Sequence, residues 1–213
     1  EPCCGGDTMK HVRWLAVAGL VAALVLAGCG PQAQDEDNVQ IIEDEKEQVY
    51  IFPDGTIARG GDAEWMKEAV ARLYPTENFR SVSAEEAQHI LGTTIVLPDL
   101  PGRFHLVGFA SGGSNEAASV KTYWAAPESK EWLEVAIRRT DTNMKHFETP
   151  WCDEGTEVEG KKISDVFPWA RQRCTSTIEI PGWYVHLWML NVPGDDARHI
   201  ATSIYDKLLA LAE

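Results

Sequence analysis

The sequence predicts an α+β domain, in which an antiparallel meander sheet has helices packed on one face, including a helix at the C-terminus. Two observations lead to this fold class. From Thr93 onward, apolar and polar residues alternate with a period of two between short turn-like runs, which is typical of antiparallel strands. After Pro193 and Gly194, apolar residues recur at helical spacing, and such a stripe must pack on another apolar surface.

The predicted domain opens with a hairpin followed by a helix. Residues 49–52 and 57–59 are apolar-rich runs on either side of a Pro-Asp-Gly-Thr turn at 53–56, which is the pattern of a hairpin. Asp62 is suited to cap a helix, and apolar residues continue at helical spacing until Pro75, before which the helix must end.

A second helix and a series of strands follow. Ser83 and Glu86 form a capping box for a helix over residues 84–91, and Gly92 provides its stop. Strands are predicted at residues 93–97, 103–110, 119–126, 131–139, 156–166 (with a turn at Glu159 and Gly160), 171–180 and 183–191. Asp195 or Asp196 caps the terminal helix, whose apolar stripe comprises Ala197, Ile200, Ala201, Ile204, Leu208 and Leu211.

The strand at 183–191 is apolar on both faces, which is typical of a central strand that is covered on both sides. We expect helices to cover one face of this strand. The loop at 140–155 is one segment that could cover the other face. The alternative is an aromatic cleft that binds an apolar or sugar-containing ligand. The candidate ligand-binding residues are Tyr123, Trp124, Trp132, Tyr184 and Trp188.

The acidic composition argues against nucleic acid as a partner. The formal net charge is −14, and the sequence contains no cluster of Lys and Arg that would neutralise a phosphate backbone. G-x-S-x-G, H-E-x-x-H and phosphate-binding motifs are missing, and the histidines are scattered singly. The sequence therefore predicts no catalytic residue, no metal site and no cofactor.

The N-terminal part has the layout of an export signal. After Met9, the basic residues Lys10 and Arg13 precede an apolar run at residues 14–27. This run is shorter than the roughly 20 residues of a membrane-spanning helix. We interpret residues 9–28 as a signal peptide and residues 1–8 as an upstream extension; an uncleaved anchor or a buried core helix is the alternative.

Leu26, Ala27, Gly28 and Cys29 end this segment. In residue type and position they resemble the lipobox of bacterial lipoproteins. The resemblance implies cleavage between Gly28 and Cys29 and attachment of a diacylglycerol to the Cys29 thiol. With two or more acyl chains, the exported protein is expected to be anchored stably on the extracytoplasmic side of a bacterial membrane.

Residues 30–48 are polar and acidic, so residues 29–48 are predicted to be a lipidated N-terminus and a flexible linker with an average reach of about 25 Å. The acidic run at 35–38 lacks the glycine and the distal glutamate of an EF-hand calcium loop. The single folded domain is therefore predicted to comprise residues 49–213.

The cysteines divide into two groups. Cys3 and Cys4 lie ahead of the leader and Cys29 is assigned to lipid, so the exported domain retains Cys152 and Cys174. Outside the reducing cytosol, two such cysteines usually bond to each other, and a disulfide is the prediction. Free thiols, or a metal site that includes His146, are the alternatives.

Short segments in the C-terminal part carry a second resemblance. They are residues 84–87, 90–92, 97–98, 100–102, 123–124, 158–161, 183–190 and 200–203. Through them, residues 83–213 resemble an uncharacterised domain family of envelope lipoproteins and of the extracytoplasmic parts of anti-sigma-factor-like membrane proteins. The resemblance implies an α+β envelope module and assigns no catalytic residues.

These observations favour a non-enzymatic binding or sensing module of the cell envelope. Its predicted partners are the membrane, through the lipid on Cys29, and an envelope ligand or an envelope protein. The alternatives are a hydrolase that acts on envelope polymers through carboxylates, and a structural assembly partner with a flat apolar patch.

Overall fold

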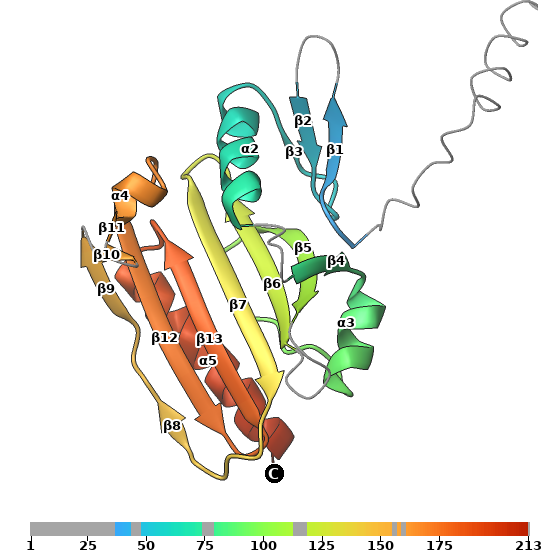
Figure 1. Ribbon diagram of the computed structural model, residues 1–213, viewed down its shortest axis with the longest axis vertical. Coiled ribbons are helices and arrows are strands. Elements are labelled where there is room, and N and C mark those ends of the chain that lie inside the picture. The colour runs from blue at the N-terminus through green and yellow to red at the C-terminus, as the bar shows by residue number, and fades with distance from the viewer. Residues whose placement is uncertain are drawn as a thin grey trace, which may run out of the picture. The chain divides into compact units, whose positions relative to one another are not determined.

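The computed structural model describes residues 37–43, 48–73, 79–112, 119–154, 157–158 and 161–212 (Figure 1). The predicted leader, the lipidation site Cys29, the first part of the linker and the turn at Glu159 and Gly160 lie outside the described residues. None of the helices in the described part combines the length and hydropathy that a membrane span requires.

The main sheet is antiparallel and has eight strands, which confirms the predicted α+β class with an antiparallel sheet. Its order is β4-β5-β6-β7-β13-β12-β8, and β9 also pairs with β12. The strands are β4 (Phe79–Val82), β5 (His105–Gly112), β6 (Ser119–Ala126), β7 (Glu131–Arg139), β8 (His146–Phe147), β9 (Trp151–Glu154), β12 (Gln172–Ile180) and β13 (Trp183–Leu190).

Two smaller sheets and the helices complete the described chain. The small sheet contains β1 (Gln40–Glu43), β2 (Gln48–Ile51) and β3 (Ile57–Ala58), and the hairpin contains β10 (Glu157–Val158) and β11 (Lys161–Lys162). The helices are α2 (Gly61–Leu73), α3 (Ala84–Leu91), α4 (Ile163–Val166) and α5 (Gly194–Ala212).

Local sequence signals explain where several elements begin and end. The backbone N–H of Glu86 donates to Ser83 Oγ over 3.1 Å, and Gly92 ends α3 in a left-handed conformation. The predicted strand at 156–166 is wrong in its last part. Ile163 is buried, and the N–H of Phe167 donates to the Ile163 carbonyl, so residues 163–166 form the short helix α4 instead of continuing the strand.

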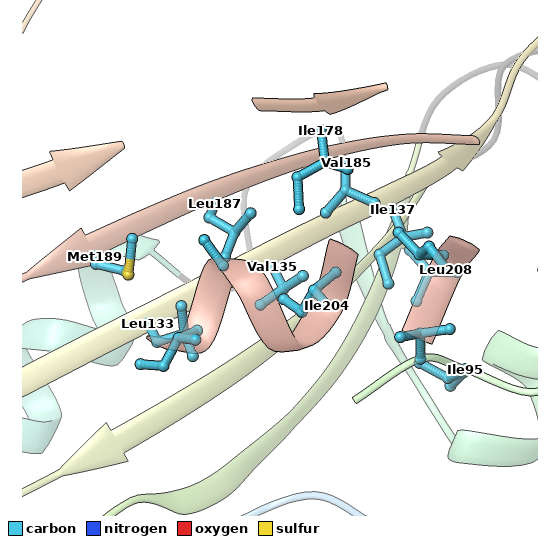
Figure 2. Packing of buried hydrophobic residues seen from close by; sticks show 14 of the residues in the cluster. Ile95, Leu133, Val135, Ile137, Ile178, Val185, Leu187, Met189, Ile204 and Leu208 are labelled. Atoms are coloured by element: carbon cyan, nitrogen blue, oxygen red, sulfur yellow. The ribbon is translucent and has the colours of Figure 1, made fainter. Parts of the chain in front are cut away.

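One face of the main sheet, here called the inner face, is covered by α3 and α5. Figure 2 shows Ile204 and Leu208 of α5 beside Val135 and Ile137 of β7, and all four side chains are buried. Burial of each such side chain stabilises the fold by about 1.5 to 3 kcal/mol. The predicted stripe of the terminal helix ends at Leu208, because Leu211 is 53% exposed.

The opposite face, here called the outer face, carries a second core. Helix α2 and the small sheet pack on it near the ends of β6, β7 and β13. The largest buried side chains of this core are Tyr50, Phe52, Trp65, Met66, Tyr123 and Trp132. Residues of the α4 region, among them Ile163 and Phe167, extend the core toward β13.

The loop at 140–155 does not cover the outer face, so this prediction is wrong. β8 and β9 pair edge to edge with β12, and the segment therefore widens the sheet in its own plane. Cys152 lies directly opposite Cys174 in this pairing, and the two form the predicted disulfide, which rules out free thiols and a metal site at these cysteines. Closing a loop of this length stabilises the fold by about 3 kcal/mol in the chain-entropy model.

The predicted strand at 93–97 is also wrong, because this segment pairs with none of the described strands. Ile95 and Val96 are buried in the inner core, and the neighbouring backbone bonds to side chains of α5. Lys207 Nζ donates to the Leu97 carbonyl over 2.9 Å, and the N–H of Asp99 donates to Ser203 Oγ over 3.0 Å. Prolines at 98 and 101 remove backbone donors that a sheet ladder would need.

Residues 37–43 and Gln48 belong to the domain and not to a free linker, because they include β1 and the start of β2. Asn38 is buried and bridges two strands: its Nδ2 donates to the Val82 carbonyl over 3.1 Å, and its Oδ1 accepts from the N–H of Phe109 over 2.8 Å. A Cβ on Gly108 would lie 2.0 Å from Asn38 Oδ1, so only glycine fits there.

Replacing Asn38 with alanine should destabilise the domain by about 2 to 4 kcal/mol, because it leaves one buried donor and one buried acceptor without partners. Chemical denaturation of the wild type and the Asn38→Ala variant measures the difference. Gln40→Ala, on the adjacent strand β1, is the matched control and should change the free energy of unfolding by about 0.5 kcal/mol or less. Equal effects of the two substitutions would contradict the bridging role of Asn38.

Candidate functional site

Part of the outer face carries a mixed polar and aromatic surface that no described helix covers (Figure 1). Residues directly opposite each other in antiparallel strands share one face, so the register groups these side chains into rows. We call the surface the outer patch; it comprises Lys121, Glu134, Arg138, Trp151, Thr175, Thr177, Tyr184, His186 and Trp188.

Two tryptophans stand in the same row of the outer patch. Trp151 lies opposite Thr175, and Thr175 lies opposite Trp188. The two tryptophans are therefore separated by two strand spacings, or about 10 Å. Trp151 is 57% exposed, whereas Trp188 is partly buried and packs edge-on against Phe167, with the ring centroids 5.3 Å apart. The α4 region thus fixes the orientation of Trp188.

A mostly buried ion pair forms part of the floor of the outer patch. Lys121 Nζ lies 2.7 Å from Glu134 Oε1, and the two side chains are 19% and 10% exposed. The same ammonium group lies 4.1 Å from the centre of the Phe79 ring. Each charge of this pair is therefore compensated by its partner.

His186 lies in the next row, between Ala136 of β7 and Thr177 of β12. Burial lowers the pKa of its imidazole, while the nearby carboxylate of Glu134 opposes the shift and the Lys121 ammonium adds to it. The ring is therefore neutral near pH 7, with one nitrogen that donates and one that accepts hydrogen bonds.

Tyr184 and Arg138 form the far end of the outer patch. They lie opposite each other on β13 and β7, and the Arg138 guanidinium lies 4.4 Å from the centre of the Tyr184 ring. Arg138 is exposed, so it presents hydrogen-bond donors to solvent beside an aromatic ring.

The five predicted aromatic residues do not form one cleft. Tyr184 and Trp188 belong to the outer patch, but Tyr123 and Trp132 are fully buried in the second core, with ring centroids 5.9 Å apart. Trp124 packs on the inner core, on the other side of the sheet. The ligand-binding role of these residues stays a prediction. The outer patch contains only Tyr184 and Trp188 of the five, together with residues that were not among them.

The sequence does not single out the other seven members of this surface, which are Lys121, Glu134, Arg138, Trp151, Thr175, Thr177 and His186. It predicts a loop at Trp151, whereas β9 pairs with four residues of β12. The signal that finds it is the disulfide: because Cys152 must lie close to Cys174 of a strand, its neighbour Trp151 is expected to lie beside that strand as well.

A separate cleft of about 570 Å³ lies between β3, the first turn of α2 and the turn that joins β6 to β7. Its basic side chains already have partners: Arg103 donates two hydrogen bonds to Glu131 and contacts Asp196, and His105 Nδ1 lies 2.6 Å from Asp54 Oδ2. Burial raises the pKa of the Asp54 carboxyl, but hydrogen bonds with His105 and Thr56 outweigh this effect and hold the pKa below its usual value.

The cleft shares no residue with the outer patch. Asp62 and Glu128 add carboxylates to its lining, which gives it an acidic character. Among the described residues, no group of three or more His, Cys, Asp or Glu side chains is arranged to hold a metal ion.

Comparison of the chain with known protein families, curated proteins and solved structures gives no match.

The lowered pKa of His186 predicts a pH-dependent stability. The folded imidazole stays neutral below pH 6.5, its ordinary pKa, whereas the unfolded chain binds a proton there, so the free energy of unfolding should fall as the pH drops below about 6.5. Chemical denaturation at pH 7.5 and pH 5 should show a smaller loss for His186→Gln than for the wild type. The same substitution at the exposed His199 controls for the loss of an imidazole, and an unchanged profile in His186→Gln would refute the assignment.

Proposed function

We propose that the chain is a lipid-anchored binding protein of the bacterial cell envelope and that its outer patch binds a sugar-containing polymer. The resemblance of residues 26–29 to a lipobox supports the anchor. The disulfide between Cys152 and Cys174 supports an oxidising compartment, since such bonds are rare in the reducing cytosol.

The row that contains Trp151 and Trp188 is the observation that favours a sugar ligand. Sugar rings have apolar C–H faces that stack on aromatic side chains and hydroxyl groups that need hydrogen-bond partners. The outer patch offers both, because the hydroxyl of Thr175 lies between the two tryptophans and the neutral His186 lies in the next row.

The shape of the outer patch favours an extended ligand, and its charges do not favour a polyanion. The patch lies on a sheet face, where a polymer contacts several strands at once, whereas small ligands usually bind in enclosed pockets. Lys121 is paired with Glu134, and Arg138 shares its row with Glu179, so positive and negative groups balance. Such a surface does not select a polyanion.

Replacing Trp151 with alanine should weaken binding to purified peptidoglycan, or to soluble oligomers of N-acetylglucosamine, about tenfold, which corresponds to about 1.4 kcal/mol. The exposed ring loses its stacking contact, while the fold stays intact because Trp151 lies on the edge strand β9. Co-sedimentation with peptidoglycan and calorimetric titration with the oligomers measure the affinity.

Met144→Ala is the control, because Met144 is 60% exposed and lies between β7 and β8, outside the outer patch. It should leave the affinity unchanged. Trp188→Phe tests the second ring with little loss of packing against Phe167. The proposal fails if the wild-type protein binds neither glycan, or if Trp151→Ala binds as tightly as Met144→Ala. Mass spectrometry of the native protein tests the anchor separately, through the lipid on Cys29.

A further inference from the structure

The small sheet presents an apolar face to solvent. Tyr50 and Ala58 are buried against the second core, and the alternation of side chains along each strand therefore turns the neighbouring residues outward. The register places these outward residues side by side on three strands. We call this surface the apolar face; its apolar residues are Ile42, Val49, Ile51 and Ile57, and the polar Gln40, opposite Ile51, lies on the same side of the sheet.

This apolar face is unusual for a sheet exposed to water, because solvent-facing positions of antiparallel strands are usually polar. Ile42 and Ile57 are 47% and 46% exposed, and Val49 and Ile51 are partly exposed. Ile41, at the edge of the same sheet, is 40% exposed. Within the described part of the chain, the small sheet thus carries three of the seven exposed large apolar residues.

The position of the small sheet in the chain places it close to the proposed anchor. Asp37 comes eight positions after Cys29, and these eight steps limit the distance between the two residues to about 28 Å even if the chain is fully extended. Asp37 and Asn38 are fixed to the domain, since Asp37 Oδ2 accepts from the N–H of Ala84 and Asn38 is bonded to two strands. Strand β1 begins two residues later.

Other occupants of the apolar face are less suitable. Four aliphatic side chains fall far short of the roughly 800 Å² that each partner of a stable dimer buries. Two copies would also bring together chains of net charge −14. The apolar run at 14–27 is removed when the chain is cleaved after Gly28, as the lipobox implies.

We propose that the apolar face rests on the lipid bilayer that holds the acyl chains of Cys29, and that it fixes the orientation of the domain on the membrane. This inference rests on the lipid anchor of the proposed function. Transfer of aliphatic side chains from water to the boundary between head groups and acyl chains is favourable in free energy, and a short tether keeps these side chains near that boundary. Glu43, which ends β1 and points to the other side of the strand from Ile42, stays in the aqueous layer.

The test uses the full lipidated chain in phosphatidylcholine vesicles that contain a lipid with a nitroxide on its acyl chain. A fluorophore is attached to Ile42→Cys and, as the matched control, to Glu43→Cys, which lies one residue further along β1 and points to the other side of the strand. Met144→Cys is the distant control. We expect quenching at position 42 to be about twofold stronger than at position 43, because only a side chain inserted by several ångströms meets the nitroxide.

Equal quenching at positions 42 and 43 in vesicle-bound protein would overturn the proposed membrane contact while leaving the lipid anchor intact. Stronger quenching at Met144→Cys than at Ile42→Cys would overturn it as well, and would place another surface on the bilayer. If mass spectrometry finds no lipid on Cys29 and the chain does not bind the vesicles, the anchor and the membrane contact both fail.

Discussion

Strand β13 carries large side chains on both of its faces, and both rows need cover. Val185, Leu187 and Met189 point into the inner core, whereas Trp188 and Leu190 contact the second core. A single helical layer cannot satisfy both requirements, so the chain supplies two covers. The C-terminal helix α5, together with α3, closes the inner face, and the small sheet with α2 and the α4 region covers part of the outer face.

The small sheet, α2 and the α4 region cover only part of the outer face. The outer patch is the part of that face that they leave uncovered. Near Leu190 the side chains of β13 are buried, but Trp188, His186 and Tyr184 become partly exposed as the strand leaves the cover. The same arrangement orients the molecule in our proposal: the small sheet that covers one part of the outer face turns its own apolar side away from the sheet. In our proposal, the layer formed by the small sheet and α2 thus leaves the glycan-binding surface uncovered and also provides the surface that faces the membrane.

Patterns that depend on neighbouring residues predicted much of this fold. The capping residues Ser83 and Gly92, the alternation in β7 and the stripe of α5 each report local structure. Predictions failed where distant contacts decide the outcome. Residues 93–97 bond to side chains of α5, β9 is a strand because β12 lies beside it, and Asn38 belongs to the domain because of strands far along the chain. For the candidate site, the sequence indicated the aromatic strand β13 but not the register that places Trp151 in the same row as Trp188.

The central claim is that a sugar-containing polymer lies across the outer patch. Oxidative footprinting of tryptophans in the folded protein, with and without bound peptidoglycan glycan strands, tests this claim most directly. We expect the glycan to protect Trp151 strongly and Trp188 partly, while Trp124, on the inner face, reacts equally in both samples. If Trp151 reacts as fast with bound glycan as without it, the polymer does not lie across the outer patch.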